Sequence, residues 1–348
     1  MRPPAYSIGR PIGPDHPPFV IAELSANHLG SLERALAIVD AAADAGADAM
    51  KLQTFTPASM TLDAHGRGFD IDDGPWKGRS LWELYDEAHT PWEWHEVLFA
   101  RGQARGLIVF SSPFDAIAVE RLDRLGAPAF KIASFEVGDL ELVACAARTN
   151  KPLIMSTGMA SDDEVAEAVE VARTNGNGGV ALLHCVSGYP TPIEQTNLKR
   201  LDALGLHGTV VGISDHSPGS TVPIAAVARG ACLIEKHLTL ARADGGPDAG
   251  FSLEPAELAE VVAGCKLAWQ ALGDGSAKRP AVESTSRAFR RSLYAVSDIA
   301  PGEPLTRVNV RSIRPGFGLA PRELPVVLSK CAKVAITRGT PLAWELLA

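Results

Sequence analysis

The chain has 348 residues, of which 46% are hydrophobic and 21% are charged, an ordinary composition for a globular protein. Its 33 Lys and Arg against 41 Asp and Glu give a net charge of −8, which argues against general binding to nucleic acid. No apolar run approaches the roughly 18 residues of a membrane span, and the Pro-rich residues 1–16 lack the apolar core of a signal peptide. Five scattered cysteines without a CxxC motif indicate reduced thiols, so we expect a cytoplasmic protein without a membrane partner.

Short apolar runs alternate with helical segments between residues 19 and 272. Near-continuous apolar runs are typical of parallel strands that are buried on both faces. The segments between them carry helix signals, such as the N-cap Ser31 and the capping box of Ser161 and Glu164. Repeated βα units predict a TIM barrel, and the alternative, an open doubly wound sheet, lacks a GxGxxG motif after its first strand. The runs are Phe19–Leu24, Ala49–Leu52, Leu107–Phe110, Ala129–Ile132, Leu153–Met155, Val180–Leu183, Val210–Ile213 and Cys232–Ile234.

One connection, Thr54 to Gly106, is much longer than the others and holds four of the six tryptophans. Connections of that length inside a compact domain are usually functional or contain helices of their own. Ser80–Ala88 and Trp92–Arg105 have helical patterns. We expect the remainder to fold over the barrel mouth.

The composition changes after Gly273. Residues 274–291 are polar and predict a linker, and three short strand-like runs follow it, Ser292–Val296, Val308–Ile313 and Lys333–Ile336. We therefore expect a barrel over residues 1–273, a linker over 274–291 and a small β domain over 292–348.

Polar residues follow every apolar run, at the barrel end where TIM-barrel chemistry takes place. Lysine is costly to bury unless an anion meets it, so the lysines among these residues predict a pocket for a phosphorylated or carboxylated small substrate. The alternative is that each lysine pairs with a nearby acid. The lysines are Lys51, Lys131 and Lys236, and the acids are Glu23, Glu235 and Asp215.

His216 and His237 follow neighbouring strands at matched positions. Adjacent strands lie about 4.8 Å apart, so both imidazoles can reach one metal ion and leave its other positions open to water or substrate. Such an ion acts as a Lewis acid or activates water. The alternative is that both histidines are structural. For the cysteines at positions 145, 185, 232 and 265 we expect core packing.

A set of segments in order along the chain resembles the sialic acid synthase family: PPFVIAELSANHLGSLERA, DAMKLQTFTP, FSSPFD, FKIAS, IMSTGMA, LLHCVSGYPTP, VGISDHSPG, IEKHLTL and PDAGFSLEP. The C-terminal stretch, with Arg314-Pro315-Gly316, resembles that family's antifreeze-like (SAF) domain. Within the family, SANHLGSLERA, TFTPASMTLD, LWELYDEAHTPWEWH and RADGGPDAGFSLEP look most like the pseudaminate branch.

The resemblance implies a TIM barrel with a C-terminal SAF domain that condenses phosphoenolpyruvate, an N-acetylated amino sugar and water, and releases phosphate by C–O cleavage. For the pseudaminate branch the sugar is 2,4-diacetamido-2,4,6-trideoxy-L-altrose. It also implies a divalent metal, manganese before magnesium or cobalt, on His216 and His237. The implied contacts to phosphoenolpyruvate are Lys51, Ser112, Lys131, Ser134, Ser156, Ser187 and Ser214. Those to the sugar are Gln53, Tyr189, Asp248 and Arg314, the last from the partner in a domain-swapped homodimer, and Glu23 lies near the reacting carbons.

The residues by themselves also allow other functions. Within the family, these are N-acetylneuraminate and legionaminate synthesis. A related 3-deoxy sugar acid synthase would want a second basic cluster for a sugar phosphate, which we do not find in the sequence. A metal-dependent hydrolase is expected to have an HxH motif after the first strand. An ice-binding module is expected to have a weakly charged C-terminal domain.

Overall fold

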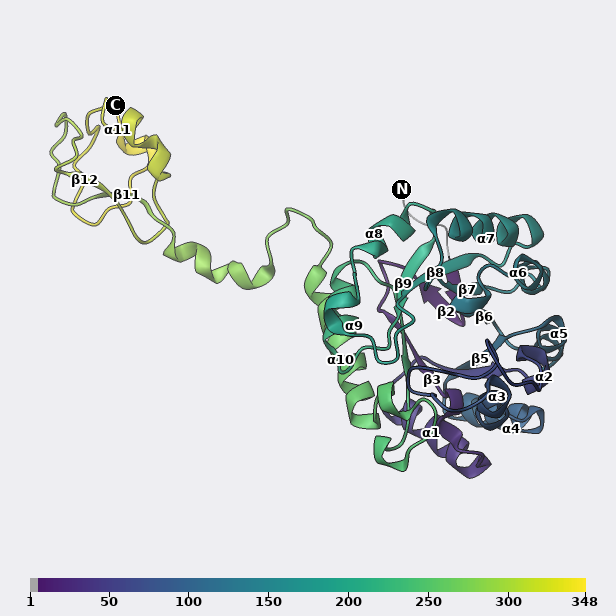
Figure 1. The fold of residues 1–348 in the computed structure, drawn as a ribbon. Helices are drawn as coiled ribbons and strands as arrows, with labels where there is room; N and C mark the ends of the chain where they lie inside the picture. Colours follow the sequence, from purple (N-terminus) through teal and green to yellow (C-terminus); the bar gives the residue numbers. More distant parts are fainter. Residues whose placement is uncertain (1–5) are drawn as a thin grey trace. The chain divides into compact units, whose positions relative to one another are not determined.

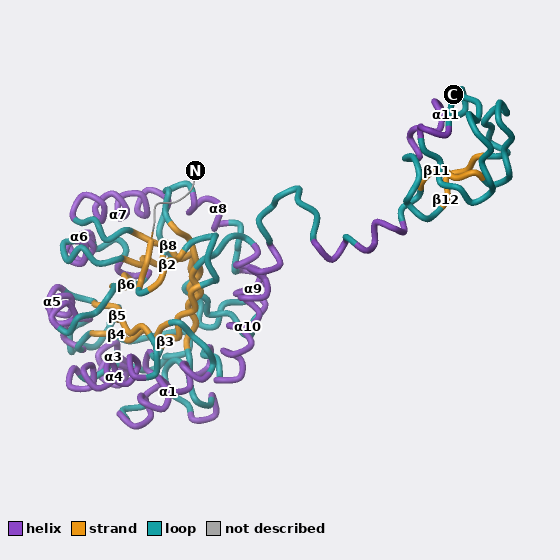
Figure 2. The backbone as a smooth tube through the Cα atoms, turned by 180° about the vertical axis from the view of Figure 1, so that it is seen from behind, coloured by secondary structure: helices purple, strands orange, loops and turns teal. Residues whose placement is uncertain are grey.

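The computed structural model describes residues 6–348. These residues form two compact units that divide between Gly273 and Asp274 (Figure 1). The first unit contains a closed barrel in which each strand is parallel to its neighbours (Figure 2). Each of the eight predicted apolar runs supplies one strand, so the predicted TIM barrel is confirmed. The strands are β3 (Phe19–Glu23), β4 (Ala49–Thr54), β5 (Ile108–Pro113), β6 (Phe130–Ile132), β7 (Leu153–Ser156), β8 (Val180–Cys185), β9 (Val210–Ser214) and β10 (Leu233–His237).

The last strand, β10, closes the barrel by pairing with the first, β3. The register runs from Leu233 opposite Phe19 to His237 opposite Glu23. The closure therefore places the carboxyl end of β10 directly beside that of β3.

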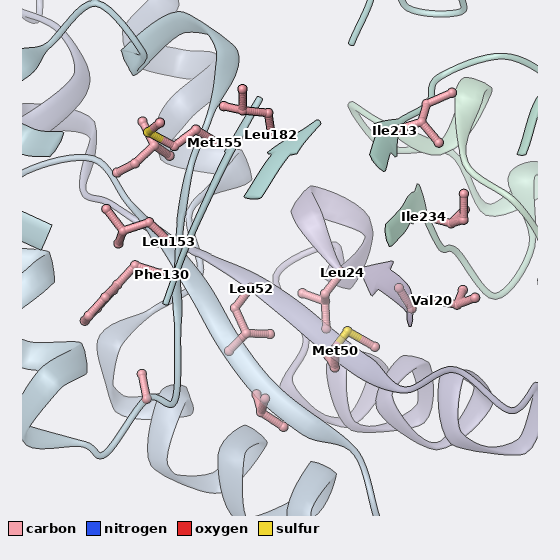
Figure 3. Close-up of a cluster of buried hydrophobic side chains, with 14 of the residues drawn as sticks. Val20, Leu24, Met50, Leu52, Phe130, Leu153, Met155, Leu182, Ile213 and Ile234 are labelled. Atoms are coloured by element: carbon pink, nitrogen blue, oxygen red, sulfur yellow. The ribbon is translucent and has the colours of Figure 1, made fainter. Parts of the chain in front are cut away.

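Helices surround the strands, and their ends follow the predicted caps. The Ser31 side chain accepts a hydrogen bond from the Arg34 backbone N–H, and Ser161 and Glu164 form the predicted capping box. The side chains between strands and helices form a continuous apolar layer that includes Val20, Met50 and Phe130 (Figure 3). The surrounding helices are α1 (Leu32–Asp44), α4 (Trp92–Ala104), α5 (Ala116–Arg124), α6 (Leu140–Ala147), α7 (Asp162–Asn175), α8 (Arg200–Gly205), α9 (Thr221–Ala228) and α10 (Pro255–Leu272).

A hairpin of β1 (Tyr6–Ile8) and β2 (Arg10–Ile12) packs against the inner, amino-terminal part of the barrel. Tyr6, Ile8 and Ile12 join one buried cluster with strand residues such as Phe19 and Phe110. The Tyr6 hydroxyl donates a hydrogen bond to the Leu153 carbonyl at 3.0 Å. The interior of the barrel is therefore filled with apolar side chains at this end, so a site inside the barrel must lie at the other end.

The long connection contains α2 (Pro57–Met60) and α3 (Leu81–Ala88) before α4. Both helices that were predicted within it are confirmed. Between α2 and α3, Trp76 donates a hydrogen bond from Nε1 to the Pro247 carbonyl at 2.8 Å. The segment thus reaches the loop that follows β10, as expected for a segment over the barrel mouth.

The second unit holds an antiparallel pair, β11 (Ser292–Ala295) and β12 (Val310–Ile313), the short helix α11 (Leu324–Val327) and a buried apolar cluster. The prediction of a third strand at Lys333–Ile336 is wrong. The backbone bends at Lys333, and the residues on either side bridge to different segments, Ala332 to Leu347 and Ile336 to Ile299. Among residues 6–348, no helix is both long enough and apolar enough to cross a membrane.

Gly212 in β9 provides a test of the barrel packing. A Cβ at this position would lie 2.4 Å from the backbone oxygen of Leu233 and 2.7 Å from Cδ2 of Leu183. Because the nearer atom belongs to the backbone of the adjacent strand, we expect Gly212→Ala to lower the free energy of unfolding by about 1–3 kcal/mol.

Gly205, the last residue of α8, is the matched control because a Cβ there meets no atom within 4 Å. We expect Gly205→Ala to leave the free energy of unfolding unchanged or to raise it by up to about 1 kcal/mol. Urea denaturation of both variants measures the difference. Equal midpoints would contradict the packing argument.

Candidate active site

A cavity of about 330 Å³ lies at the carboxyl ends of the barrel strands. Most of the sequence-predicted site residues line it, and they come from the ends of β4, β6, β7, β8, β9 and β10 and from the loops that follow. They are Lys51, Gln53, Lys131, Ser134, Ser156, Tyr189, Ser214, His216, His237 and Asp248. Glu23, Ser112 and Ser187 lie beside lining residues, as described below.

Buried charges form the base of the cavity. The Lys51 ammonium contacts the Glu23 carboxylate and donates a hydrogen bond to Ser112 Oγ at 3.2 Å. Glu235 Oε1 lies 3.8 Å from Lys51 Nζ and 3.5 Å from Lys131 Nζ. Burial raises the pKa of Glu23, although Lys51 acts in the opposite direction. Lys51 and Lys131 therefore pair with acidic side chains, as the alternative interpretation of the sequence predicted. Both lysines also line the cavity.

Lys236 does not belong to this group, so the prediction of three converging lysines is wrong. Its side chain is fully buried, with Nζ 2.9 Å from Asp215 Oδ2 and a hydrogen bond to the Ser217 carbonyl. Successive side chains of a strand point to opposite faces. Because Glu235 and His237 face the cavity, the residue between them faces the surrounding helices.

His216 and His237 lie together, with ring centroids 5.2 Å apart. His216 donates from Nδ1 to the Val186 carbonyl at 3.2 Å, which leaves the lone pair on Nε2. Burial lowers the pKa of His216 to about 4 and that of His237 well below its ordinary value, so both rings are neutral at pH 7. Neutral imidazole is the form that binds metal ions.

Further features of this histidine pair fit a divalent cation. The buried Nδ1 of His237 has no hydrogen-bond partner among the described residues. A hydrogen bond from the far nitrogen of a ligating histidine, like that of His216 to Val186, fixes the ring for coordination. Within residues 6–348, no third His, Cys, Asp or Glu completes a cluster with them. Two protein ligands would leave the other positions on the cation for water or substrate oxygens.

Hydroxyl groups converge around Gly158, which follows β7. Its backbone N–H donates to Ser134 Oγ at 3.1 Å, and a Cβ at this position would lie 2.5 Å from Ser187 Oγ. The hydroxyls of Ser156 and Ser187 are buried and have no hydrogen-bond partner in the described chain. Buried hydroxyls without partners are costly, so a ligand that carries several acceptor oxygens fits this place.

A second polar group lies nearer the mouth. Gln53 Nε2 donates to Ser25 Oγ at 3.2 Å, and Ser25 in turn contacts the Asp248 carboxylate. Burial raises the pKa of Asp248. These side chains present amide, hydroxyl and carboxyl groups together, a suitable set for sugar hydroxyls and amides.

Aromatic rings border the histidines and the mouth. The Tyr189 ring lies 4.5 Å from the His216 ring and 5.0 Å from that of Phe251. Trp76, from the long connection, lies 5.6 Å from Tyr189. The rings enclose the space in front of the histidines on the side of the β8 and β10 loops.

The structure adds residues that sequence reasoning missed. Glu136 lines the cavity two residues after Ser134, and its Oε2 is buried without a partner. Burial raises its pKa to about 7. The position of Glu136 just past β6 was the feature of the sequence that could have identified it as a site residue. Cys185, the last residue of β8, is buried as expected, and it also lines the cavity, with its Sγ 4.0 Å from His216 Nδ1.

Arg314 belongs to the second unit, directly after β12, and its side chain is exposed. The other predicted site residues all belong to the first unit.

Two family models match this chain. The model of the NeuB family matches residues 38–277, and the model of the SAF domain matches residues 290–348. The first match covers the barrel from within α1 to just past α10. The second covers the small β domain.

Proteins named as pseudaminic and legionaminic acid synthases align over nearly the whole chain. It is 45% identical to a pseudaminic acid synthase of Campylobacter jejuni, over 93% of this chain and 95% of the relative. It is 41% identical to a pseudaminic acid synthase of Helicobacter pylori, over 94% and 97%. With an N,N'-diacetyllegionaminic acid synthase of Campylobacter jejuni the identity falls to 35%, over 90% and 95%.

A solved structure has the same fold. The N-acetylneuraminic acid synthetase of Leptospira borgpetersenii, crystallised with citrate, superposes with a TM-score of 0.74 at 32% identity, covering 82% of this chain and 95% of the other.

Glu136 gives a pH-dependent prediction for stability. Its pKa is about 7 in the folded chain against an ordinary 4.5, so the folded state binds more protons between these values. Stability from this group is therefore complete below pH 4.5 and is lost as the pH rises through 7. We expect Glu136→Gln to reduce the fall in unfolding free energy between pH 5 and pH 8, measured by urea denaturation. Glu167→Gln, on the exposed face of α7, is the control, and equal slopes in the two variants would contradict the assignment.

Proposed function

Because the chain belongs to the NeuB family, we propose that it condenses phosphoenolpyruvate, 2,4-diacetamido-2,4,6-trideoxy-L-altrose and water into pseudaminic acid and phosphate. The observation that carries this proposal is the cavity itself. Two lysines and two hydroxyls without a partner among the described residues, those of Ser156 and Ser187, lie at its base, beside two neutral histidines. The higher identity to pseudaminic acid synthases than to legionaminic acid synthase supports the choice of sugar.

The base of the cavity would hold phosphoenolpyruvate. Lys51 and Lys131 supply positive charge, and the hydroxyls around Gly158 supply directional hydrogen bonds to phosphate and carboxylate oxygens. Ser112 supports Lys51 through its hydrogen bond, and Ser156, Ser187 and Ser214 complete the set. Lys51 and Ser134 already make hydrogen bonds, with Ser112 and the Gly158 N–H, so these two groups need little rearrangement to meet charge that develops on oxygen.

The reaction joins C3 of phosphoenolpyruvate to the aldehyde carbon of the sugar. Water adds to C2, and the C–O bond to phosphate breaks, so that phosphate leaves with its oxygen. Glu23 is the group that we propose to exchange a proton with the reacting atoms, because its raised pKa and its contact with Lys51 allow it to gain or lose a proton near neutral pH.

The histidine pair fits a divalent cation, manganese in our proposal, with magnesium or cobalt as alternatives. When bound, such a cation supplies Lewis acidity toward the aldehyde oxygen. The chain's own contribution is orientation, since the Val186 carbonyl fixes the tautomer of His216. Gln53, Tyr189 and Asp248 would bind the sugar's polar groups, and Trp76 together with Phe251 would exclude water.

A 3-deoxy sugar acid synthase that takes a phosphorylated aldose is less well supported. Such a substrate needs a second basic cluster. The described residues that line the cavity include two lysines, both at the base, and no arginine.

The division of the chain into domains is also part of the proposal. We assign residues 1–273 to the synthase barrel, 274–291 to a linker and 292–348 to the SAF domain. The resemblance supports a domain-swapped homodimer in the cytoplasm, in which Arg314 of one chain binds the sugar's N-acetyl group at the other chain's barrel. An exposed guanidinium beyond a polar linker is compatible with this role.

The proposed function predicts the outcome of a substrate panel. The protein is incubated with phosphoenolpyruvate, manganese and one aldehyde sugar at a time, phosphate release is followed, and the product is identified by mass. We expect turnover of the 2,4-diacetamido-trideoxy-altrose above that of the legionaminate precursor and of N-acetylmannosamine. Faster turnover of N-acetylmannosamine would sink the assignment. His216→Ala and His237→Ala serve as controls that fold but lose manganese-dependent turnover.

The role of Arg314 is testable by complementation. His216→Ala and Arg314→Ala are each expected to be inactive, and the two are then co-expressed. If Arg314 acts in trans, a mixed dimer has one site with both defects and one with neither. Random pairing makes half of the dimers mixed, so roughly a quarter of all sites should be intact. Purified mixed dimers without recovered activity would refute the trans arrangement.

A further inference from the structure

Three aromatic side chains form a wall at the outer part of the cavity. Phe55 and Phe114 lie edge to face with ring centroids 5.3 Å apart, and Phe55 lies 5.8 Å from Tyr85 in the same manner. All three line the cavity. They pack with Ala26 and Ala88 into a small cluster that is separate from the barrel core. We call Phe55, Tyr85 and Phe114 the aromatic wall.

The barrel strands fix how far this wall lies from the charged base. Lys51, Gln53 and Phe55 are alternate residues of β4 and its extension, and all three line the cavity. Alternate residues advance about 7 Å along a strand, so Phe55 lies about 13 Å along the chain direction from Lys51. On the next strand, Pro113 pairs with Thr54, so Phe114 follows β5 at the level where Phe55 follows β4. Charged, polar and aromatic layers thus follow one another toward the mouth.

This order constrains how an open-chain sugar lies. Its aldehyde carbon must reach phosphoenolpyruvate at the base, next to the histidines. The polar layer, in which Gln53 and Asp248 both contact Ser25, would then meet the middle of the sugar, and the far end of the sugar, C6, would reach the aromatic wall. The only polar side-chain atom of the wall is the Tyr85 phenol oxygen. Burial raises the pKa of Tyr85, and the negative charge of Glu136 raises it further.

We propose that the aromatic wall binds the C6 methyl group of the sugar and so selects 6-deoxy sugars against their 6-hydroxy counterparts. This inference rests on the proposed function and names the residues that decide its substrate. A methyl group gains apolar contact with the rings. A hydroxyl group in the same place loses water without gaining a partner from Phe55 or Phe114, and buried polar groups without partners are disfavoured.

The test compares two substrates that differ only at C6: 2,4-diacetamido-2,4,6-trideoxy-L-altrose and 2,4-diacetamido-2,4-dideoxy-L-altrose. We expect the parent protein to favour the 6-deoxy sugar by about 10–100-fold in kcat/KM. Phe114→Tyr places a hydroxyl in the wall and should reduce this ratio by at least about 5-fold, through KM rather than kcat, because the reacting end of the sugar is untouched.

Two further variants give the controls. Phe114→Leu keeps the wall apolar and should keep a preference for the 6-deoxy sugar. Phe135→Tyr adds the same hydroxyl to a ring that also lines the cavity but is 65% exposed and stands outside the wall, so the ratio should stay within about twofold of the parent. Thermal melting verifies folding of each variant, and Phe55→Tyr replaces Phe114→Tyr if the latter does not fold.

The outcomes separate this inference from the function on which it rests. A parent ratio near one, or an unchanged ratio in the tyrosine variant, overturns the role of the wall while turnover of the 6-deoxy sugar still supports pseudaminate synthesis. The same result would arise if the wall held the C4 acetamido methyl group, which both sugars carry. Phosphate release only with N-acetylmannosamine overturns the proposed function and the inference together.

Discussion

Closure of the barrel between β10 and β3 is the constraint on which the site depends. The pairing of His237 with Glu23 joins the ends of the sheet and brings groups more than 200 residues apart in sequence to the same rim. Because all eight strands run in parallel, their carboxyl ends meet in one ring. At the other end, the β1–β2 hairpin and the lower strand residues fill the interior. The interior of the barrel is therefore open only toward the carboxyl ends of the described strands.

The charges inside that ring influence one another strongly. Lys51 and Lys131 share the Glu235 carboxylate, and Lys51 also contacts Glu23. Burial favours neutral forms, which raises the pKa of Glu23 and lowers the pKa of both histidines. One physical cause therefore raises the pKa of the carboxyl group and keeps both imidazoles uncharged, as the proposed proton exchange and the proposed cation binding require.

The layering of the cavity follows from the period of the strands. Alternate residues of β4 and its extension place lysine, glutamine and phenylalanine at increasing distance from the base, and the long connection adds Tyr85 and Trp76 around the mouth. Strand geometry thus sets the depth of each layer, while the loops supply its aromatic part. The division suits a substrate that carries a reactive polar end and an apolar far end.

Local patterns in the sequence determined the fold of the first unit. Near-continuous apolar runs mark strands buried on both faces, and capping residues mark helix starts, so the barrel, the Ser31 cap and the Ser161–Glu164 capping box were all predictable. The same rule placed His216 and His237 side by side, because matched positions on adjacent parallel strands are neighbours in space. The third strand that the sequence predicted in the second unit does not form, because Cys331, Ala332 and Ile336 bridge singly to three separate segments.

What only the tertiary structure decided was the direction and partner of each polar side chain. In the sequence, Lys236 follows an apolar run in the same way as Lys51 and Lys131. In the structure, its neighbours Glu235 and His237 face the cavity, so the Lys236 side chain points to the outer face of the strand, where it contacts Asp215. Cys185 and Glu136 entered the cavity for the corresponding reason, because the faces of a strand and the turn after it are fixed by register with neighbours distant in sequence. Composition and spacing act locally and determine which elements form. The inner and outer faces of those elements, and the pKa shifts that follow from burial, exist only after the barrel has closed.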